Sequence, residues 1–196
     1  MKKHSGRPLE YSKVDVLDAA IDVFWEKGYK ACSTVDLCNR TGLGRGSLYN
    51  AFGSKHKLYE EALKRYHEFW IETQINILKQ TNSAKQNLEN LLSWAVEEDF
   101  KESAKGCMLI NASMEYWKND PTVAYWSRIH ANHLESVIKK VIQNGIDSNE
   151  ISSNISVDDL ARNYLCSFYG IRALNAFIPD IETAQDTVKS IMANFP

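Results

Sequence analysis

Apolar residues recur at steps of three and four along most of this chain, and that spacing strongly constrains its fold. Between residues 12 and 27, Val14, Leu17 and Ile21 follow it. This period places side chains on one face of an α-helix. Comparable segments continue along the sequence, and none shows the alternation of a half-buried strand. The pattern predicts an all-α protein.

Capping residues, glycines and prolines divide the pattern into about nine helices. Gly28, Gly42 and Gly145 are expected to end the first, second and seventh of them. Either Ser33 or Thr34 can cap the second. The expected helices are residues 12–27, 34–41, 45–52, 55–79, 83–100, 106–117, 121–143, 156–177 and 183–195.

Charge is distributed unevenly along the chain. Up to Lys57, ten basic and six acidic residues give a net charge of +4, whereas the remainder has thirteen and nineteen, a net of −6. A basic N-terminal part on an acidic remainder suggests that only the former meets a polyanion. We divide the chain into a flexible basic arm, a helical head and a helical body, at residues 1–9, 10–70 and 71–196.

Composition fits an ordinary helical protein, with 44% hydrophobic and 24% charged residues in 196. No apolar run reaches the roughly 18 residues that span a membrane. The basic N-terminus lacks the apolar segment of a secretory signal. The four cysteines are scattered, which argues for a reducing compartment and against a disulfide framework or zinc cluster. We expect a cytoplasmic protein with no membrane partner.

Motifs for catalysis and metal binding are missing from the sequence. It has no Ser-His-Asp set, no phosphate-binding loop and no dinucleotide fingerprint. His130 and His133 lie three apart on one expected helix, a spacing that can share a metal, but no Cys or carboxylate pattern completes the site. We expect no enzymatic activity, no cofactor and no metal.

Glycines cluster in the segment TGLGRGSLYNAFGSKHKLY, residues 41–59. Each glycine costs a helix about 1 kcal/mol relative to alanine, so the choice needs a reason. A helix-turn-helix over 33–52 provides one, because its second helix can lie in the major groove of DNA. Gly42 would form the left-handed turn. Gly44 and Gly46 would let the helix start, with its free N–H groups, approach a phosphate.

Two faces are expected on this second helix. Leu48 and Phe52 pack inward. The outward side chains could reach base edges or phosphates, and these candidates are Arg45, Ser47, Tyr49 and Asn50.

Basic groups flank the helix-turn-helix. Lys55 lies in the first turn of the next expected helix, where the helix dipole disfavours it, and a nearby phosphate would offset that cost. Arg7 belongs to the basic arm, which could reach an adjacent groove. We count Arg7, Ser33 and Lys55 among the DNA-binding candidates.

The span VLDAAIDVFWEKGYKACSTVDLCNRTGLGRGSLYNAFGSKHKLYEEAL, residues 16–63, resembles the DNA-binding head of TetR-family transcriptional regulators. The segments GRP, VFWEKGY and KGCMLINASMEY resemble one branch of that family. The resemblance implies an all-helical homodimer, a ligand pocket in the body, and repression released by a small molecule. Ala51 stands where members often carry His or Tyr. Positions that usually touch DNA match Thr34, Arg45, Gly46, Ser47, Tyr49, Asn50 and Lys55.

Dimerisation is expected through the last two helices, packed with their copies as a four-helix bundle. Two recognition helices would then lie about 34–36 Å apart, one DNA turn, and require a palindromic operator. The alternative for these apolar residues is packing within one subunit. The interface candidates are Leu160, Tyr164, Phe168, Ile171, Val188, Ile191 and Met192.

Aromatic residues are frequent between the head and the last helices. They could line a pocket for a small apolar or amphipathic effector, although plain core is the commoner role of such residues. The pocket candidates are Trp70, Trp94, Met108, Asn111, Glu115, Tyr125 and Trp126.

Two alternatives to a ligand-responsive repressor stay open. Cys107 follows Lys105 and Gly106 at an expected helix start, a setting that can lower a thiol pKa, so the chain could sense electrophiles or oxidants. A buried core thiol is the competing interpretation. Alternatively, the head could contact a protein, and salt dependence would distinguish that from DNA binding.

Overall fold

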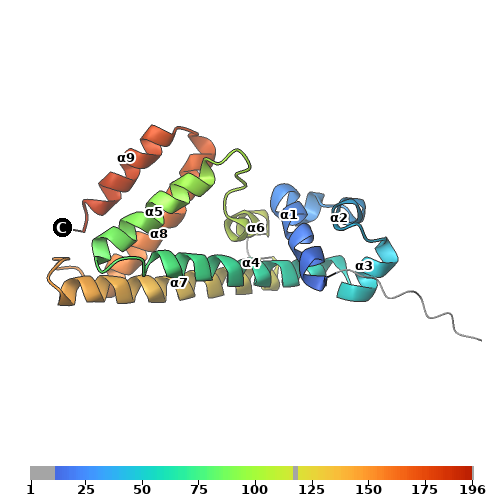
Figure 1. Cartoon of the computed structure of the whole chain (residues 1–196), viewed down its shortest axis with the longest axis horizontal. Coiled ribbons are helices and arrows are strands. Elements are labelled where there is room, and N and C mark those ends of the chain that lie inside the picture. Colours follow the sequence, from blue (N-terminus) through green and yellow to red (C-terminus); the bar gives the residue numbers. More distant parts are fainter. Residues whose placement is uncertain (1–11, 117–118, 196) are drawn as a thin grey trace, which may run out of the picture. The chain divides into compact units, whose positions relative to one another are not determined.

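The computed structural model describes residues 12–116 and 119–195. In that part of the chain there are nine α-helices and no strand (Figure 1). The prediction of an all-α fold is confirmed. None of the described helices is both long and apolar enough to cross a membrane. The helices are α1 (Lys13–Ala31), α2 (Thr34–Thr41), α3 (Arg45–Phe52), α4 (Lys55–Ile77), α5 (Ala84–Asp99), α6 (Met108–Tyr116), α7 (Pro121–Asp147), α8 (Val157–Phe177) and α9 (Ile181–Met192).

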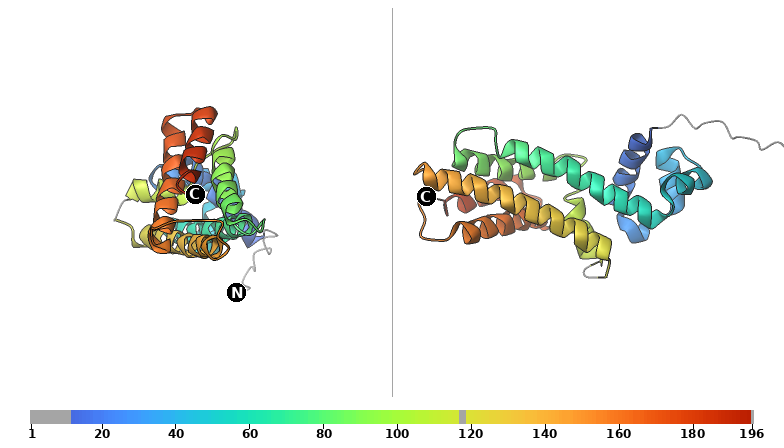
Figure 2. Two further views of the ribbon diagram at one scale, coloured as in Figure 1. Left: turned by 90° about the vertical axis from the view of Figure 1, so that its left-hand side faces the viewer. Right: turned by 90° about the horizontal axis from the view of Figure 1, so that it is seen from below.

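The chain divides within α4 into two compact units, residues 1–62 and 63–196, which we call the head unit and the body unit. The boundary expected from sequence, at residue 70, lies further along the same helix. In the head unit, α2 contacts both α1 and α3. In the body unit, α5, α8 and α9 contact one another and lie on one side of α7 (Figure 2).

The first helix begins and breaks where its sequence indicates. The Ser12 side chain accepts a hydrogen bond from the backbone N–H of Asp15. Gly28 has a φ of 72°, so the regular helix stops there, and a further short turn reaches Ala31 across the kink. Helix α1 contributes Val16, Ala20 and Phe24 to the core of the head unit. The other helices of this unit add the buried side chains of Leu37, Leu48, Phe52 and Leu58.

Two buried polar contacts fix the helices of the body unit. The Tyr164 hydroxyl donates to the Leu88 carbonyl over 2.6 Å and so joins α8 to α5. The Arg172 guanidinium lies 2.7 Å from the Asp99 carboxylate, and both side chains are more than nine-tenths buried. Asn175 donates to the other Asp99 oxygen over 3.1 Å. Because the carboxylate is satisfied on both sides, this ion pair avoids the cost of an unpaired buried charge.

The C-terminal end of α7 differs from expectation. Gly145 does not end the helix but lies inside it, buried, and α7 continues to Asp147. A Cβ at Gly145 would lie 2.7 Å from the Ile151 side chain and 2.8 Å from Ala84. Glycine is needed here because the following loop folds back onto the helix, as the backbone hydrogen bond from Ile151 to Gly145 also requires.

The residues expected at a dimer interface require a correction. The structure buries five of them within the chain's own core, so they offer no surface to a second copy: Leu160, Tyr164, Phe168, Ile171 and Val188. Ile191 and Met192 are partly buried against the same core. An amphipathic helix first buries its apolar stripe on its own domain, and sequence periodicity reports that face. The large apolar side chains exposed at the junction of α8 and α9 are Leu174, Phe177, Ile178 and Ile181.

Candidate nucleic-acid interface

The start of α2 is fixed by a reciprocal cap. The Ser33 side chain accepts from the backbone N–H of Asp36, and the Asp36 carboxylate accepts from the backbone N–H of Ser33 over 2.8 Å. Lys27 of α1 lies 2.6 Å from the same carboxylate. These contacts hold the pKa of Asp36 well below its usual range, the hydrogen bond from Lys27 contributing most and those from Ser33 next. Ser33 is thus the cap, and its side chain is engaged within the protein.

A tight turn joins α2 to α3. Gly42 ends α2 with a φ of 70°, in the left-handed conformation that glycine adopts without strain. Leu43 follows and is buried, which anchors the turn in the head core. Helix α3 then begins after Gly44, which has no side chain and therefore makes no side-chain capping hydrogen bond. The expected helix-turn-helix is therefore present in this part of the head unit.

The inward face of α3 matches the expectation, and the outward face does so in part, since Tyr49 is half-buried. Leu48 has no exposed surface and Phe52 is 4% exposed. Arg45, Gly46 and Asn50 are exposed, and Ser47 is half-buried. A Cβ added to Gly44 or Gly46 would meet nothing within 4 Å. The packing of the protein therefore does not require glycine at either position.

Tyr49 and Thr34 connect the two helices of the motif. The Tyr49 hydroxyl and the Thr34 hydroxyl lie 2.6 Å apart. The Arg45 guanidinium lies over the Tyr49 ring, 5.9 Å from its centre. These three side chains form one group across α2 and α3, so a phosphate or base edge there would meet side chains that hold one another in place.

Lys55 has a partner that sequence reasoning missed. Its ammonium donates to the Tyr29 carbonyl over 2.5 Å and lies 4.3 Å from the centre of the Tyr29 ring. This contact offsets the unfavourable position of Lys55 in the first turn of α4 without the phosphate that its sequence position suggests. No local pattern identifies this contact, because Tyr29 and Lys55 are 26 residues apart in the sequence. Arg7 and the rest of the basic arm lie outside the described residues.

The expected pocket residues of the body unit lie in different environments. Trp70 and Trp94 contact each other with ring centres 5.6 Å apart, and Met108 is buried. Trp126 contacts His67, but its neighbour Tyr125 is 47% exposed. Asn111 and Glu115 of α6 are exposed and half-buried, respectively. The structure thus buries or pairs some of the predicted pocket residues, whereas Asn111 and Tyr125 are exposed.

Titratable groups meet inside the body unit. The Nδ1 atoms of His67 and His130 lie 3.1 Å apart, and both side chains are buried. Burial, and then the nearby His67, lower the pKa of His130 to about 3. The pKa of His67 is also lowered, mainly by burial and then by the nearby His133. His67 was missed because it is distant from His130 in sequence. Among the described residues, no group of three His, Cys, Asp or Glu side chains is arranged to hold a metal ion.

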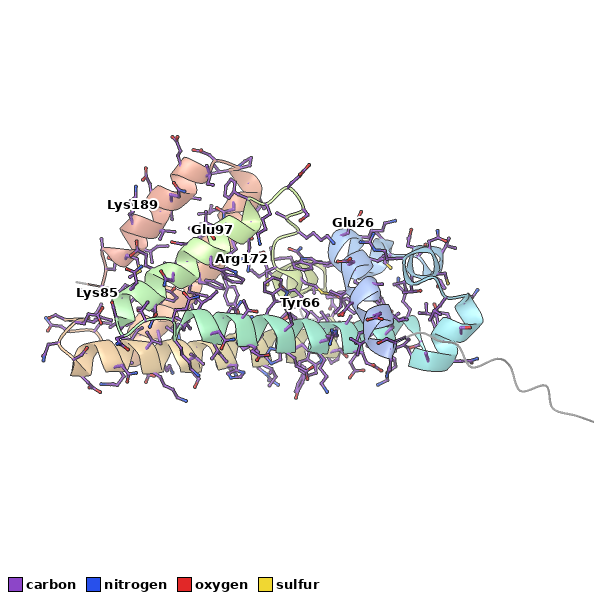
Figure 3. The ribbon with its side chains drawn as sticks, viewed as in Figure 1. Glu26, Tyr66, Lys85, Glu97, Arg172 and Lys189 are labelled. Carbon is purple, nitrogen blue, oxygen red and sulfur yellow. The ribbon has the colours of Figure 1, made fainter. Side chains whose placement is uncertain are left out.

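Tyr66 and Arg172, labelled in Figure 3, lie on α4 and α8 in the body unit. The Tyr66 hydroxyl accepts a hydrogen bond from the backbone N–H of Met108. Burial, and then the neighbouring Cys107, raise the pKa of the Tyr66 phenol. Cys107 is only 5% exposed. A reactive thiol needs access, so this burial favours the packing interpretation of Cys107.

Comparison with known proteins agrees with the geometry of the head. Residues 16–62 match the family described as bacterial regulatory proteins, tetR family. An HTH-type regulator of Bacillus subtilis, YezE, is 29% identical over 93% of this chain and 95% of its own length. The Escherichia coli repressor ComR is 26% identical over 87% of this chain and 82% of its own.

Solved structures share the fold. The TetR-family regulator CifR, a cysteine mutant bound to double-stranded operator DNA, superposes with a TM-score of 0.86 and 23% identity, over 97% of this chain and 100% of its own. FadR of Bacillus subtilis, in complex with stearoyl-CoA, gives a TM-score of 0.74 and 15% identity, over 94% and 100%.

A capped helix, a glycine turn and a short helix with an exposed start define a helix-turn-helix DNA-binding protein. The family match of the head, and relatives that align over most of the chain, narrow this class of protein further. Residues 16–62 form a TetR-type DNA-binding head, and the chain is similar over most of its length to HTH-type transcriptional regulators. These relatives do not favour either of the two alternatives, which are a head that contacts another protein and redox sensing through Cys107.

Proposed function

We propose that this chain is a repressor that binds a palindromic DNA operator as a homodimer, with the start of α3 in the major groove. The open space around Gly44 and Gly46 supports this most directly. Two glycines that the fold does not need, beside exposed Arg45 and Asn50, suit close approach to a DNA backbone. CifR and ComR, an operator-bound regulator and a repressor, are consistent with that role.

Dimerisation follows from the small footprint of one head. A helix of eight residues reaches few base pairs, and a two-fold pair doubles the contacts at half-sites one DNA turn apart. The exposed apolar side chains at the junction of α8 and α9 supply a candidate surface, Phe177 being 75% exposed. Larger apolar patches on a monomer commonly mark interfaces.

We also propose that a small apolar or amphipathic effector binds the body and releases the operator. The contact of Trp70 with Trp94 supplies aromatic surface of the kind that lines ligand sites. The neighbour FadR holds an acyl-CoA, which is an amphipathic molecule. An effector acts only if it binds the DNA-incompetent state more tightly. The protein would work in the cytoplasm, where bacterial DNA lies, without enzymatic activity.

Selection of bound sequences from a random duplex pool tests the DNA-binding role. We expect a palindromic site whose affinity falls steeply as salt rises from about 50 to about 200 mM, because phosphate contacts release counterions. Arg45→Ala should weaken that site. A failure to enrich any duplex at low salt would instead favour a protein partner for the head.

A further inference from the structure

A groove of about 730 Å³ opens on the body unit, between the end of α4, the start of α5 and one face of α7. Lys85 marks this end of α5 in Figure 3. The volume lies in the range of small-molecule sites, about 300–1,000 Å³. None of the residues expected to line a pocket belongs to this groove.

The groove has an apolar floor. Ile75 and Leu78 contribute it from the end of α4 and the residue that follows, and Val137 and Val141 contribute it from successive turns of α7. Leu78 and Val141 are buried, and Ile75 and Val137 are partly buried. An apolar group laid along this floor would remove further hydrocarbon from water, which is favourable.

Two free ammonium groups belong to the same lining. Lys79 and Lys140 are exposed, and neither forms an ion pair with any described residue. The adjacent Lys139, which does not line the groove, lies 2.7 Å from Asp158. Lys79 and Lys140 thus carry charge that no described residue neutralises.

The one carboxylate that lines the groove is already engaged. Glu150 accepts hydrogen bonds from the backbone N–H groups of Ala84 and Lys85 over 2.7 and 3.0 Å, and from the Ser83 hydroxyl. Its negative charge thus serves the N-terminus of α5, where the helix dipole favours it. The unmatched charge among the lining residues is therefore positive.

We propose that this groove is a second small-molecule site, and that it binds an amphipathic carboxylate. The hydrocarbon part lies on Ile75, Leu78, Val137 and Val141, and the carboxylate meets Lys79 and Lys140. Ile75 belongs to α4, the helix that begins in the head unit, so the occupant contacts a helix common to both units. All residues that line this groove belong to the body unit. If no ligand binds in the groove, the DNA-binding proposal therefore still stands.

Isothermal titration of the full-length chain with decanoate, below its micelle concentration, tests this site. We expect binding that weakens at least tenfold in the double variant Lys79→Glu, Lys140→Glu. Asn144→Trp fills the groove from an exposed position of α7 without changing charge, and it should weaken binding as much. Lys64→Glu, an exposed charge reversal elsewhere on α4, is the matched control and should bind as the wild type does.

Decanol, which has the same chain without the charge, should bind at least tenfold more weakly than decanoate. Thermal melting of each variant checks that it is folded before its ligand binding is compared with that of the wild type. Three results would overturn the proposal: decanoate does not bind the wild type, both groove variants bind it as tightly as the control does, or decanol binds equally well.

Discussion

The hydroxyl groups of Thr34 and Tyr49 lie 2.6 Å apart and join the two helices of the DNA-binding motif. One hydroxyl belongs to the first turn of α2 and the other to the middle of α3. Both are residues that the family resemblance assigns to DNA contact. Their bond fixes the direction of Tyr49 in the protein without DNA, which would preorganise the pair for the DNA contact that the resemblance implies.

Tyr49→Phe should destabilise the folded protein by about 1 kcal/mol, the usual net worth of one hydrogen bond. Urea unfolding measures this. Thr34→Val should cost a similar amount, and the double variant should cost little more than either alone, because the two share one interaction. Fully additive costs would show that the bond contributes nothing.

Gly46→Ala should have opposite effects on stability and on DNA binding. A methyl group there meets nothing within 4 Å, and alanine is a better helix former by about 1 kcal/mol, so the melting temperature should rise. DNA affinity should fall, because the methyl group would occupy the space left for the sugar-phosphate backbone. Arg45→Ala, which leaves that space open, should lower affinity and reduce sequence preference by about 1–3 kcal/mol. Unchanged affinity in Gly46→Ala would rule out close approach at this residue.

Acid should destabilise the body unit through His67 and His130. Their folded-state pKa values lie below that of a free histidine, near 3 for His130. The unfolded chain therefore binds protons first, and stability is lost as pH falls below about 6.5. For His130 the loss between about pH 6.5 and pH 5 is about 2 kcal/mol. Urea unfolding at both pH values measures it.

His130→Asn provides the comparison for the pH dependence. Its unfolding free energy should change less over the same pH interval, since one of the two low-pKa groups is gone. Asp36 does not interfere, because a carboxylate with a lowered pKa loses its stabilisation only below the unfolded value of about 4. An identical pH slope in the variant and the wild type would remove His130 from the explanation.

Gly145→Ala should destabilise the protein by about 1–3 kcal/mol, the range seen for overpacked cores. The new methyl group would lie within 3.0 Å of both Ile151 and Ala84. Denaturant titration measures the change. Gly44→Ala, where the added carbon meets open space, is the control and should cost far less. Equal effects of the two substitutions would contradict the packing argument.

Phe177→Asp should shift the chain toward monomer and thereby weaken operator binding. Phe177 is 75% exposed near the end of α8, and a carboxylate there would be buried unpaired in a two-fold contact. Sedimentation velocity should show at least a tenfold weaker dimer. Met114→Asp changes a residue of α6 that is 72% exposed, and it should leave the dimer intact. A dimer unaffected by the first variant would place the interface elsewhere.

Local patterns in the sequence predicted the helices and the binding motif. The cap at Ser33, the left-handed Gly42 and the inward Leu48 and Phe52 depend on neighbours within a few residues, and all are present. Apolar periodicity likewise identified the buried face of α8. It could not distinguish a dimer face from an internal one, because both are apolar.

The remaining features depend on partners that are far apart in sequence. Lys55 meets the Tyr29 carbonyl, His67 meets His130, and Arg172 meets Asp99. Gly145 is an example of a misread local signal, since its small size serves contacts with Ala84 and Ile151 and not a helix end.

By itself the sequence determined the all-α fold, the helix-turn-helix and the exposed positions of Arg45 and Asn50, because capping, turn formation and amphipathicity act over a few residues. Only the tertiary structure decided which side chains pair inside the body, which apolar surface stays open, and where a groove forms. These depend on which helices meet, and the free energy of packing distant segments is not encoded in any local pattern.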